Sequence, residues 1–176
     1  AADWQLPASV RGAMRSWQFS TATAELDAVE AILRQRAALE REAAGASLRL
    51  PVTLRHAFET GDLVGAATEA SAELATIGTI EDATRRRLAE PTLLESLGLL
   101  GADPEAGMRA AREALAGGDL STANRAASAA RAAWASAAGV GQARVVSGVL
   151  LLASCILGAG LALSLSRRLR RPPAAG

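Results

Sequence analysis

The chain has 176 residues, half of them hydrophobic, with a net charge of +1, one cysteine and one histidine. A charge so close to zero argues against nucleic-acid binding, which favours a strongly basic surface. The 19 cationic residues are all arginines, and the lack of lysine excludes a P-loop lysine, a Schiff-base lysine and a pyridoxal-phosphate site.

The residues that could support metal or thiol chemistry are also scarce. Cys155 lies in an apolar stretch without a second cysteine, and His56 has no second histidine with which to bind a metal. We therefore expect no cofactor, no metal site and no enzymatic activity. The chain begins at Ala1 rather than at methionine, so we expect that a signal peptide or a larger precursor has been removed.

From the amino terminus onward, one pattern of residues recurs. Residues 6–14 (LPASVRGAM) match residues 50–58 (LPVTLRHAF), and a third copy is visible from Ala114 to Trp134. Self-similarity of this kind is typical of repeated supersecondary units. The repeat predicts about three helical hairpins.

Each hairpin carries signals for its helices. Pro7 and Pro51 suit the first turn of a short helix, and Asp103 is predicted to cap the corresponding helix of the third copy. The second helices show a 3.6-residue apolar period. Their predicted buried residues are Leu26, Val29 and Leu33, then Leu63, Ala66, Ala70, Leu74 and Ile77, then Leu120, Ala123, Ala127, Ala130 and Trp134. The sequence thus predicts an all-α fold of about three stacked antiparallel hairpins.

The turn inside each hairpin is predicted from glycine and aspartate. Gly61 and Gly118 can adopt the left-handed conformation that ends a helix, and an aspartate follows each of them as the cap of the next helix. The first copy has Trp17 and Gln18 at these positions. Its two helices could therefore run together with only a kink.

Charged and aromatic residues of the repeats are interpreted mainly as structural. We expect the carboxylates of Glu69 and Glu73 to lie on a solvated helix face, since nothing near them in the sequence indicates burial. Trp4 and Trp17 are predicted to pack the open end of the stack. Trp134 is predicted to lie in the core.

The segment 91–101 interrupts the repeats with unusual hydrophobicity. We interpret it as a short helix that either fills a groove between hairpins or exposes an apolar patch to a partner or to the membrane surface. The three arginines before it are interpreted as ordinary helix-supporting charges, with a phosphate or an acidic partner as the alternative. The candidate partner surface consists of Leu93, Leu94, Leu97, Leu99, Leu100, Arg85, Arg86 and Arg87.

Residues 145–166 contain no charged side chain. A helix of this length extends about 33 Å, which is sufficient to cross the hydrocarbon core of a bilayer. No proline occurs between Ser121 and Pro172, so the last hairpin helix is expected to continue into this stretch, with Gly139–Gly141 as its weak point. The predicted flanking charges are Arg144, Arg167, Arg168, Arg170 and Arg171.

The arginines after residue 166 predict the orientation in the membrane. The positive-inside rule places residues 167–176 in the cytoplasm, residues 143–166 in the membrane and residues 1–142 outside the cytoplasm. A tail-anchored protein with its bulk in the cytoplasm is the competing arrangement. Small residues inside the predicted span could let a second helix approach closely; these are Ser154, Gly158, Ala162, Gly160 and Ser164.

Two resemblances guide the functional interpretation. The Gly-Asp-Leu turns at residues 61–63 and 118–120 resemble those of tetratricopeptide-like helical repeats, and the chain as a whole resembles the carboxy-terminal membrane-anchored helical modules of bacterial secreted proteins. Residues 166–172 are also similar to the exit of a sensor receptor's second membrane helix. The first hypothesis is a single-pass membrane protein that docks another subunit or a second copy of itself. The alternative is the ligand-sensing part of a receptor.

Overall fold

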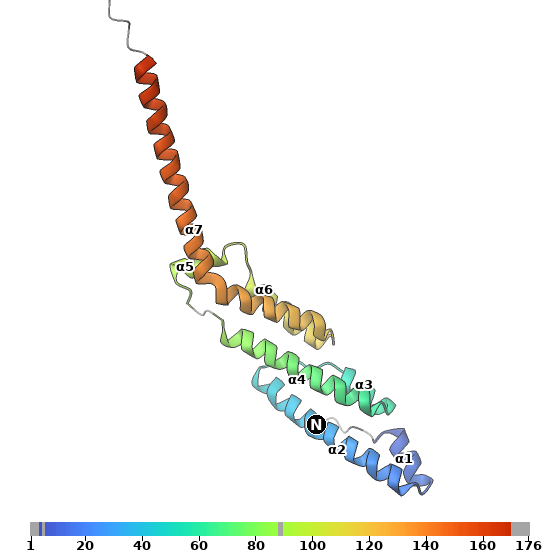
Figure 1. Cartoon of the computed structure of the whole chain (residues 1–176). Helices are drawn as coiled ribbons and strands as arrows, with labels where there is room; N and C mark the ends of the chain where they lie inside the picture. Colours follow the sequence, from blue (N-terminus) through green and yellow to red (C-terminus); the bar gives the residue numbers. More distant parts are fainter. Residues whose placement is uncertain (1–3, 5, 88–89, 170–176) are drawn as a thin grey trace, which may run out of the picture. The chain divides into compact units, whose positions relative to one another are not determined.

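The computed structural model describes residues 4, 6–87 and 90–169, with side chains through residue 162. Over these residues every regular element is an α-helix and none is a strand, which confirms the predicted all-α class. Figure 1 shows the helices in chain order. They are α1 (Ala8–Arg15), α2 (Phe19–Gly45), α3 (Thr53–Thr60), α4 (Leu63–Arg85), α5 (Leu93–Leu99), α6 (Pro104–Ala116) and α7 (Leu120–Leu169).

The helices divide into two compact units. The first unit contains the residues up to 87 together with 103–134, and the second contains 88–102 together with the residues from 135 onward. Helix α7 contributes to both units and stays helical through Gly139–Gly141. The predicted boundaries at 142 and 166 concern the position of a membrane, so they stay predictions.

Within the first unit, neighbouring helices pack through their apolar faces. Helix α1 contacts α2, α3 contacts α4, and α4 contacts both α2 and α6. An added Cβ atom on Gly107 of α6 would lie 3.5 Å from the Cβ of Ala130, which places the first part of α7 beside α6. The largest buried apolar side chains of this unit include Ile32, Leu39, Phe58, Ile77, Ile80 and Leu115.

The predicted apolar stripes are largely correct. On α4 and α7 the alanines of the stripes are buried, and Ile77 and Trp134 are buried with them, as predicted for the core, whereas Leu63, Leu74 and Leu120 are half-buried. The stripe on α2 is displaced. Leu26 and Leu33 are 37% and 38% exposed, because the contact face is centred on Val29 and Ile32 and leaves both leucines at its edge.

One turn geometry recurs at three positions that each join two paired helices of the first unit, and the end of α2 repeats it at Ser47, where φ is 54° and the Leu48 N–H donates to the Ala43 carbonyl at 2.8 Å. Trp17, Gly61 and Gly118 all have positive φ angles, of 61°, 88° and 83°. At each of these three turns the following residue donates a backbone hydrogen bond of 2.9–3.0 Å to the carbonyl five residues earlier. This pattern is the Schellman helix ending. Helices α1 and α2 are therefore separated by a true turn, and the predicted kinked continuous helix is wrong.

The predicted helix caps are confirmed at three aspartates. Asp62 accepts a hydrogen bond from the backbone of the third residue after it, at 2.8 Å, and Asp103 and Asp119 do the same at 2.8 and 2.9 Å. Such caps satisfy amide groups that have no partner inside the helix. Pro7 and Pro51 lie just before α1 and α3 rather than within their first turns.

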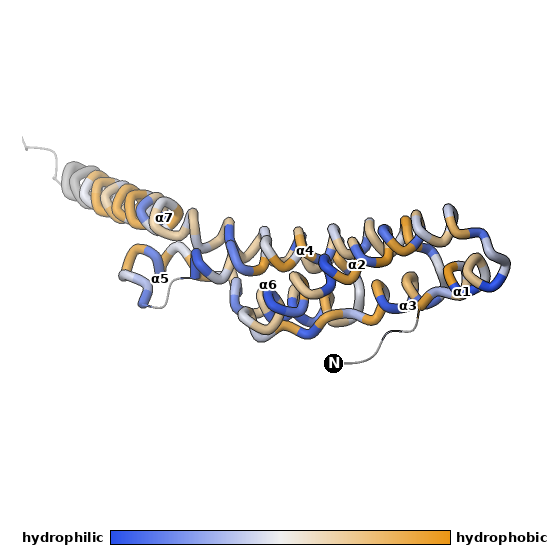
Figure 2. Tube along the Cα trace, turned by 90° about the horizontal axis from the view of Figure 1, so that it is seen from below, coloured by the Kyte–Doolittle hydropathy of each residue, from blue (hydrophilic) through white to orange (hydrophobic). Residues whose placement is uncertain are grey.

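The carboxy-terminal part of α7 differs from the rest of the described chain. It contains an 18-residue window with a mean hydropathy of 2.3, none of which is buried in the structure. Figure 2 shows this part as a nearly continuous run of hydrophobic residues. Its length and composition fit single-pass membrane anchoring.

Candidate functional site

Trp17 occupies a backbone conformation that the two equivalent turns give to glycine. A residue with a Cβ atom in the left-handed helical region pays roughly 1–2 kcal/mol relative to the right-handed region, whereas glycine does not. The Trp17 side chain gains little burial to offset this cost, because it is 77% exposed. The prediction that Trp17 packs the end of the stack is wrong, since its ring points into solvent from the α1–α2 turn.

Two further apolar side chains are exposed beside Trp17. Its ring meets the ring of Phe19 edge to face, with 5.6 Å between the centroids and 86° between the planes. Phe19 is 60% exposed and Met14 is 51% exposed. We call these three residues the aromatic corner. Exposed aromatic residues and methionine are enriched in protein–protein interfaces relative to other surfaces.

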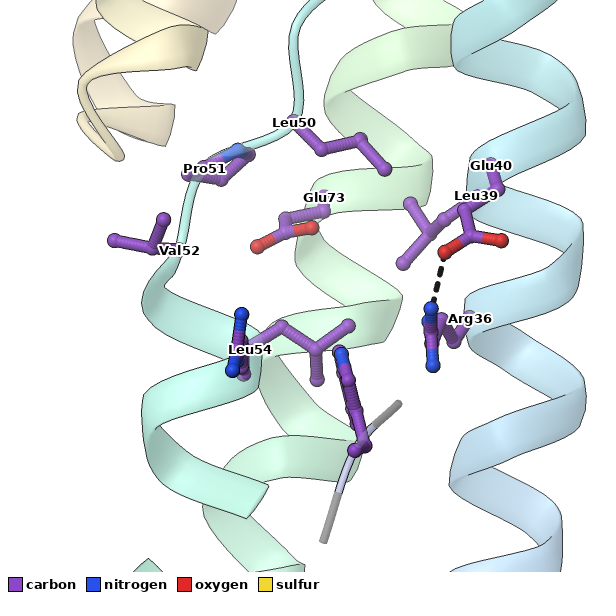
Figure 3. A pocket seen from close by; sticks show the side chains of 10 residues that line it. Arg36, Leu39, Glu40, Leu50, Pro51, Val52, Leu54 and Glu73 are labelled. Carbon is purple, nitrogen blue, oxygen red and sulfur yellow. Dashed lines mark hydrogen bonds and ion pairs between the residues drawn. The ribbon is translucent and has the colours of Figure 1, made fainter. Parts of the chain in front are cut away.

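A second feature of the first unit is a recess of about 180 Å³ between α2, α3 and α4 (Figure 3). Its apolar walls come from Leu39 on α2, from Leu50 and Pro51 before α3, and from Leu54 on α3. Glu73 on α4 lies at the recess. Drug-sized ligands usually occupy pockets of about 300–1,000 Å³, so this recess suits only a small molecule.

Glu73 is 1% exposed, which contradicts the prediction of a solvated carboxylate. The side chain was expected on the surface because α4 alone gives no sign of what packs against this position. In the fold, the start of α3 covers it. The Thr53 hydroxyl donates to Glu73 Oε1 at 3.1 Å, and the Leu54 backbone N–H also donates to the carboxylate. Glu73 therefore caps α3 from a neighbouring helix, where no side chain of the preceding segment does so.

Burial also changes the acidity of Glu73. Desolvation raises its pKa from 4.5 to about 7, and the nearby charge of Glu69 adds to the increase. The hydrogen bonds from Thr53 and Leu54 oppose the increase, because they stabilise the charged form. Glu73 is thus a buried carboxyl that exchanges its proton near neutral pH.

The mouth of the recess carries a stacked cation. The Arg36 guanidinium lies 4.4 Å from the centre of the Trp4 ring, and Arg36 Nε donates to Glu40 Oε1 at 2.7 Å. Trp4 also packs against Phe58, with 4.9 Å between the ring centroids and 48° between the ring planes. Trp4 is thus packed, but against α2 and α3 at the recess rather than at the open end of the stack, where it was predicted. An arginine over an aromatic ring is stabilised by cation–π attraction.

The predicted partner surface is split between the two units. Arg85 and Arg87 belong to the first unit, where Arg85 pairs with Asp82 and Arg87 Nε lies 2.7 Å from Glu105 Oε1. The Arg85–Asp82 pair, three residues apart on α4, fits the helix-supporting interpretation, whereas the Arg87–Glu105 pair joins the end of α4 to α6. Arg86 lines an open depression with Asp82, Arg85 and Arg131, but no buried group marks it as a binding site.

The leucine part of that surface belongs to the second unit. None of the residues of α5 is buried, which counts against the groove-filling interpretation. Leu93 is 86% exposed and the residue that ends the helix, Leu100, is 61% exposed. Leu94 and Leu97 are 42% and 37% exposed, whereas Leu99 is half-buried. The expectation of an exposed apolar patch thus fits the structure.

Among the arginines predicted to flank the membrane span, Arg144 makes a clear contact. Arg144 Nη1 donates to the carbonyl oxygens of Leu97 and Gly98, so this side chain is tied to the end of α5. Sequence reasoning missed this contact, because 46 or 47 residues separate the partners. Arg167 and Arg168 lie on α7 beyond the last described side chain, and Arg170 and Arg171 lie outside the described residues.

The small residues of the predicted span are open to their surroundings. An added Cβ atom on Gly158 or Gly160 would meet nothing within 4 Å. The Ser154 hydroxyl donates to the Leu150 carbonyl at 2.9 Å, so it needs no second helix to satisfy it. Ala162 is exposed, and the Ser164 side chain lies outside the described part. Association through this face stays a prediction.

Comparison with protein-family models, with curated proteins and with solved structures found no match. The resemblance to tetratricopeptide-like repeats therefore rests on the turn residues alone.

Proposed function

We propose that this chain is a single-pass, membrane-anchored docking or accessory subunit, and that its helical domain outside the cytoplasm binds another protein. Three repeated hairpins, α1–α2, α3–α4 and the pair formed by α6 with the start of α7, would form the docking domain. The carboxy-terminal arginines would hold the tail in the cytoplasm.

The aromatic corner is the observation that carries the docking proposal. Trp17 accepts an unfavourable backbone conformation and remains 77% exposed, although the two equivalent turns use glycine. The fold therefore gains little from a tryptophan at this position. A binding role explains it better, because tryptophan is among the residues that contribute most to binding energy when a partner buries them.

The variant Trp17→Gly tests the docking role without disrupting the turn. Glycine suits the left-handed conformation, so the free energy of unfolding should stay within about 1 kcal/mol of the native value, or rise. A stoichiometric partner that co-purifies with the native chain from membranes in mild detergent should be lost from the variant. Val64→Ala is the matched control, because Val64 is 80% exposed on α4 and outside the aromatic corner. Equal recovery of the partner with all three chains would contradict the proposal.

Anchoring is tested by a charge in the apolar stretch. Leu152→Arg should remove the chain from the membrane fraction, because a charge at the centre of a span costs about 3 kcal/mol on insertion scales. Val64→Arg adds the same charge to the exposed surface of α4 and should leave the fractionation unchanged. Full membrane retention of Leu152→Arg after carbonate washing would argue against the anchor.

The recess supports a second candidate function, the ligand-sensing part of a receptor. It lies between the first and second helix pairs and combines apolar walls with the buried Glu73 carboxyl and the Arg36 guanidinium at its mouth. A small ligand with an apolar body and one polar group would fit these walls. Quenching of Trp4 fluorescence by a small ligand, lost in Leu54→Trp, would favour the receptor over the docking subunit.

A further inference from the structure

Helix α5 is held against α7 by two close backbone contacts. An added Cβ atom on Gly98 would overlap the carbonyl oxygen of Ala137, and one on Gly141 would overlap the carbonyl oxygen of Leu94. At each of these two contacts, a glycine of one helix lies against the backbone of the other helix. All four residues belong to the second unit. This crossing fixes α5 beside residues 137–141 of α7.

Both ends of α5 are satisfied by side chains. At its start, Thr92 and Glu95 form a capping box, in which the Glu95 carboxylate accepts from the Thr92 backbone at 2.8 Å. At its end, Arg144 donates to the carbonyl oxygens of Leu97 and Gly98. A helix of seven residues would be marginal on its own. These contacts allow it to form at this place on α7.

One exposed side of α5 carries leucine side chains. Leu93, Leu97 and Leu100 are spaced as on one side of a helix and are 86%, 37% and 61% exposed. The one charge on α5 is that of Glu95, whose carboxylate is occupied by the capping box. The segment contains no arginine. The exposed surface of α5 therefore offers leucine side chains and the Ser96 hydroxyl, and it has no cationic group.

The contacts on α7 lie directly before the apolar stretch. Arg144 directly precedes Val145, the first residue of that stretch. Gly141 lies four residues before Val145, which is about 6 Å along the helix axis at 1.5 Å per residue. The headgroup layer on each side of a bilayer is about 5–8 Å thick. If the hydrocarbon core begins near Val145, the end of α5 lies at headgroup depth.

We propose that α5 lies in the headgroup layer of the bilayer that α7 crosses, with Leu93 and Leu100 in contact with acyl chains. This inference rests on the anchor in the proposed function. Lipid is the occupant favoured by continuity, because the exposed leucines adjoin a helix segment whose large exposed side chains, from Val145 to Leu161, are apolar. The attachment is hydrophobic rather than electrostatic, so it does not require anionic lipid.

Spin-label accessibility in liposomes tests this placement. The full chain with Cys155→Ala is reconstituted into phosphatidylcholine vesicles, and single nitroxide labels are attached after Leu93→Cys, Leu100→Cys, Leu152→Cys or Val64→Cys. Oxygen concentrates in lipid, whereas a nickel chelate stays in water. We expect labels at 93 and 100 to be at least threefold more accessible to oxygen, relative to nickel, than the label at 64. The label at 152 should show the highest ratio.

The labels at 64 and 152 distinguish a failure of the α5 placement from a failure of the membrane anchor. A high oxygen ratio at 152 with ratios at 93 and 100 equal to that at 64 would overturn the inference and leave the anchor intact. A low ratio at 152 would mean that the anchor itself is wrong. Labels at 93 and 100 that are shielded from both reagents would indicate a protein contact, including contact with a second copy, and would also overturn the inference.

Discussion

The buried carboxyl group of Glu73 joins two helices. Its side chain is on α4, yet its hydrogen bonds go to the first residues of α3. Desolvation raises its pKa to about 7, so the fold favours the protonated form over the charged form. The contribution of this group to stability is therefore complete below pH 4.5 and is lost as the pH rises through about 7.

The variant Glu73→Gln should remove this pH dependence. In the native chain, the free energy of unfolding should fall by up to roughly 3 kcal/mol between pH 4.5 and pH 7.5, since one pKa unit corresponds to about 1.4 kcal/mol. The variant should lack that decrease, because glutamine cannot ionise and its amide oxygen can still accept the Leu54 N–H. Denaturant unfolding in nonionic detergent, followed by tryptophan fluorescence, measures both profiles.

Glu30→Gln is the control for this series, because the Glu30 side chain is 62% exposed and pairs with Arg34 on the surface of α2. Its pH profile should follow that of the native chain. Parallel profiles for the native chain and Glu73→Gln would show that Glu73 ionises equally easily in the folded and unfolded states, which would contradict the role given to its burial.

Trp17 and Glu73 show which properties of single residues the sequence could not reveal. The repeat aligned Trp17 with two turn glycines, and all three residues share the same turn, but the alignment does not say whether the ring packs inward or stays in solvent. For Glu73, the covering residues belong to another helix, about 20 positions earlier. Helical periodicity reports on one element only, so a cap supplied by a different element is invisible to it.

At the scale of elements, the crossing of α5 and α7 depends on two glycines. Gly98→Ala would place a methyl group against the Ala137 carbonyl, and a backbone group cannot move aside as a flexible side chain can. We therefore expect α5 to separate from α7. The hydrogen bonds from Arg144 to the end of α5 would then be lost as well. Backbone amides of α5 should then exchange hydrogen at least tenfold faster, as measured by mass spectrometry.

Gly139→Ala provides the matched control for the crossing. An added Cβ atom on Gly139 would meet nothing within 4 Å, and alanine favours a helix interior by about 1 kcal/mol over glycine. This variant should keep or slightly increase the protection of α5. Unchanged exchange in Gly98→Ala would show that the close approach of the two helices does not hold α5 in place.

The elements themselves were predictable where their signals are local. The aspartate caps, the glycine turns and the apolar stripes of α4 and α7 all depend on residues within a few positions of one another. The caps and turns were correctly predicted, and so were most residues of the two stripes. The stripe of α2 was misplaced because α1 and α4 together select its contact face. The partner of α5 could not be predicted, since Arg144 lies more than 40 residues away.

For the whole molecule, the apolar end of α7 is the feature that indicates a membrane. The window with a mean hydropathy of 2.3 has no buried residue, so in water it would expose a long apolar surface at high cost. A bilayer removes that cost, and the thickness of its hydrocarbon core matches the length of the apolar helix segment. The proposed lipid contact of α5 depends on this placement, whereas the proposed docking role rests on the aromatic corner.

Protease treatment of intact cells tests this placement most directly, using the chain with an epitope tag added after Gly176. We expect the helical domain to be digested, and a short fragment from about residue 140 to the tag to survive until the membrane is dissolved with detergent. Complete protection of the full-length chain would place the domain in the cytoplasm. Complete loss of the tag without detergent would show that the apolar stretch does not cross the membrane.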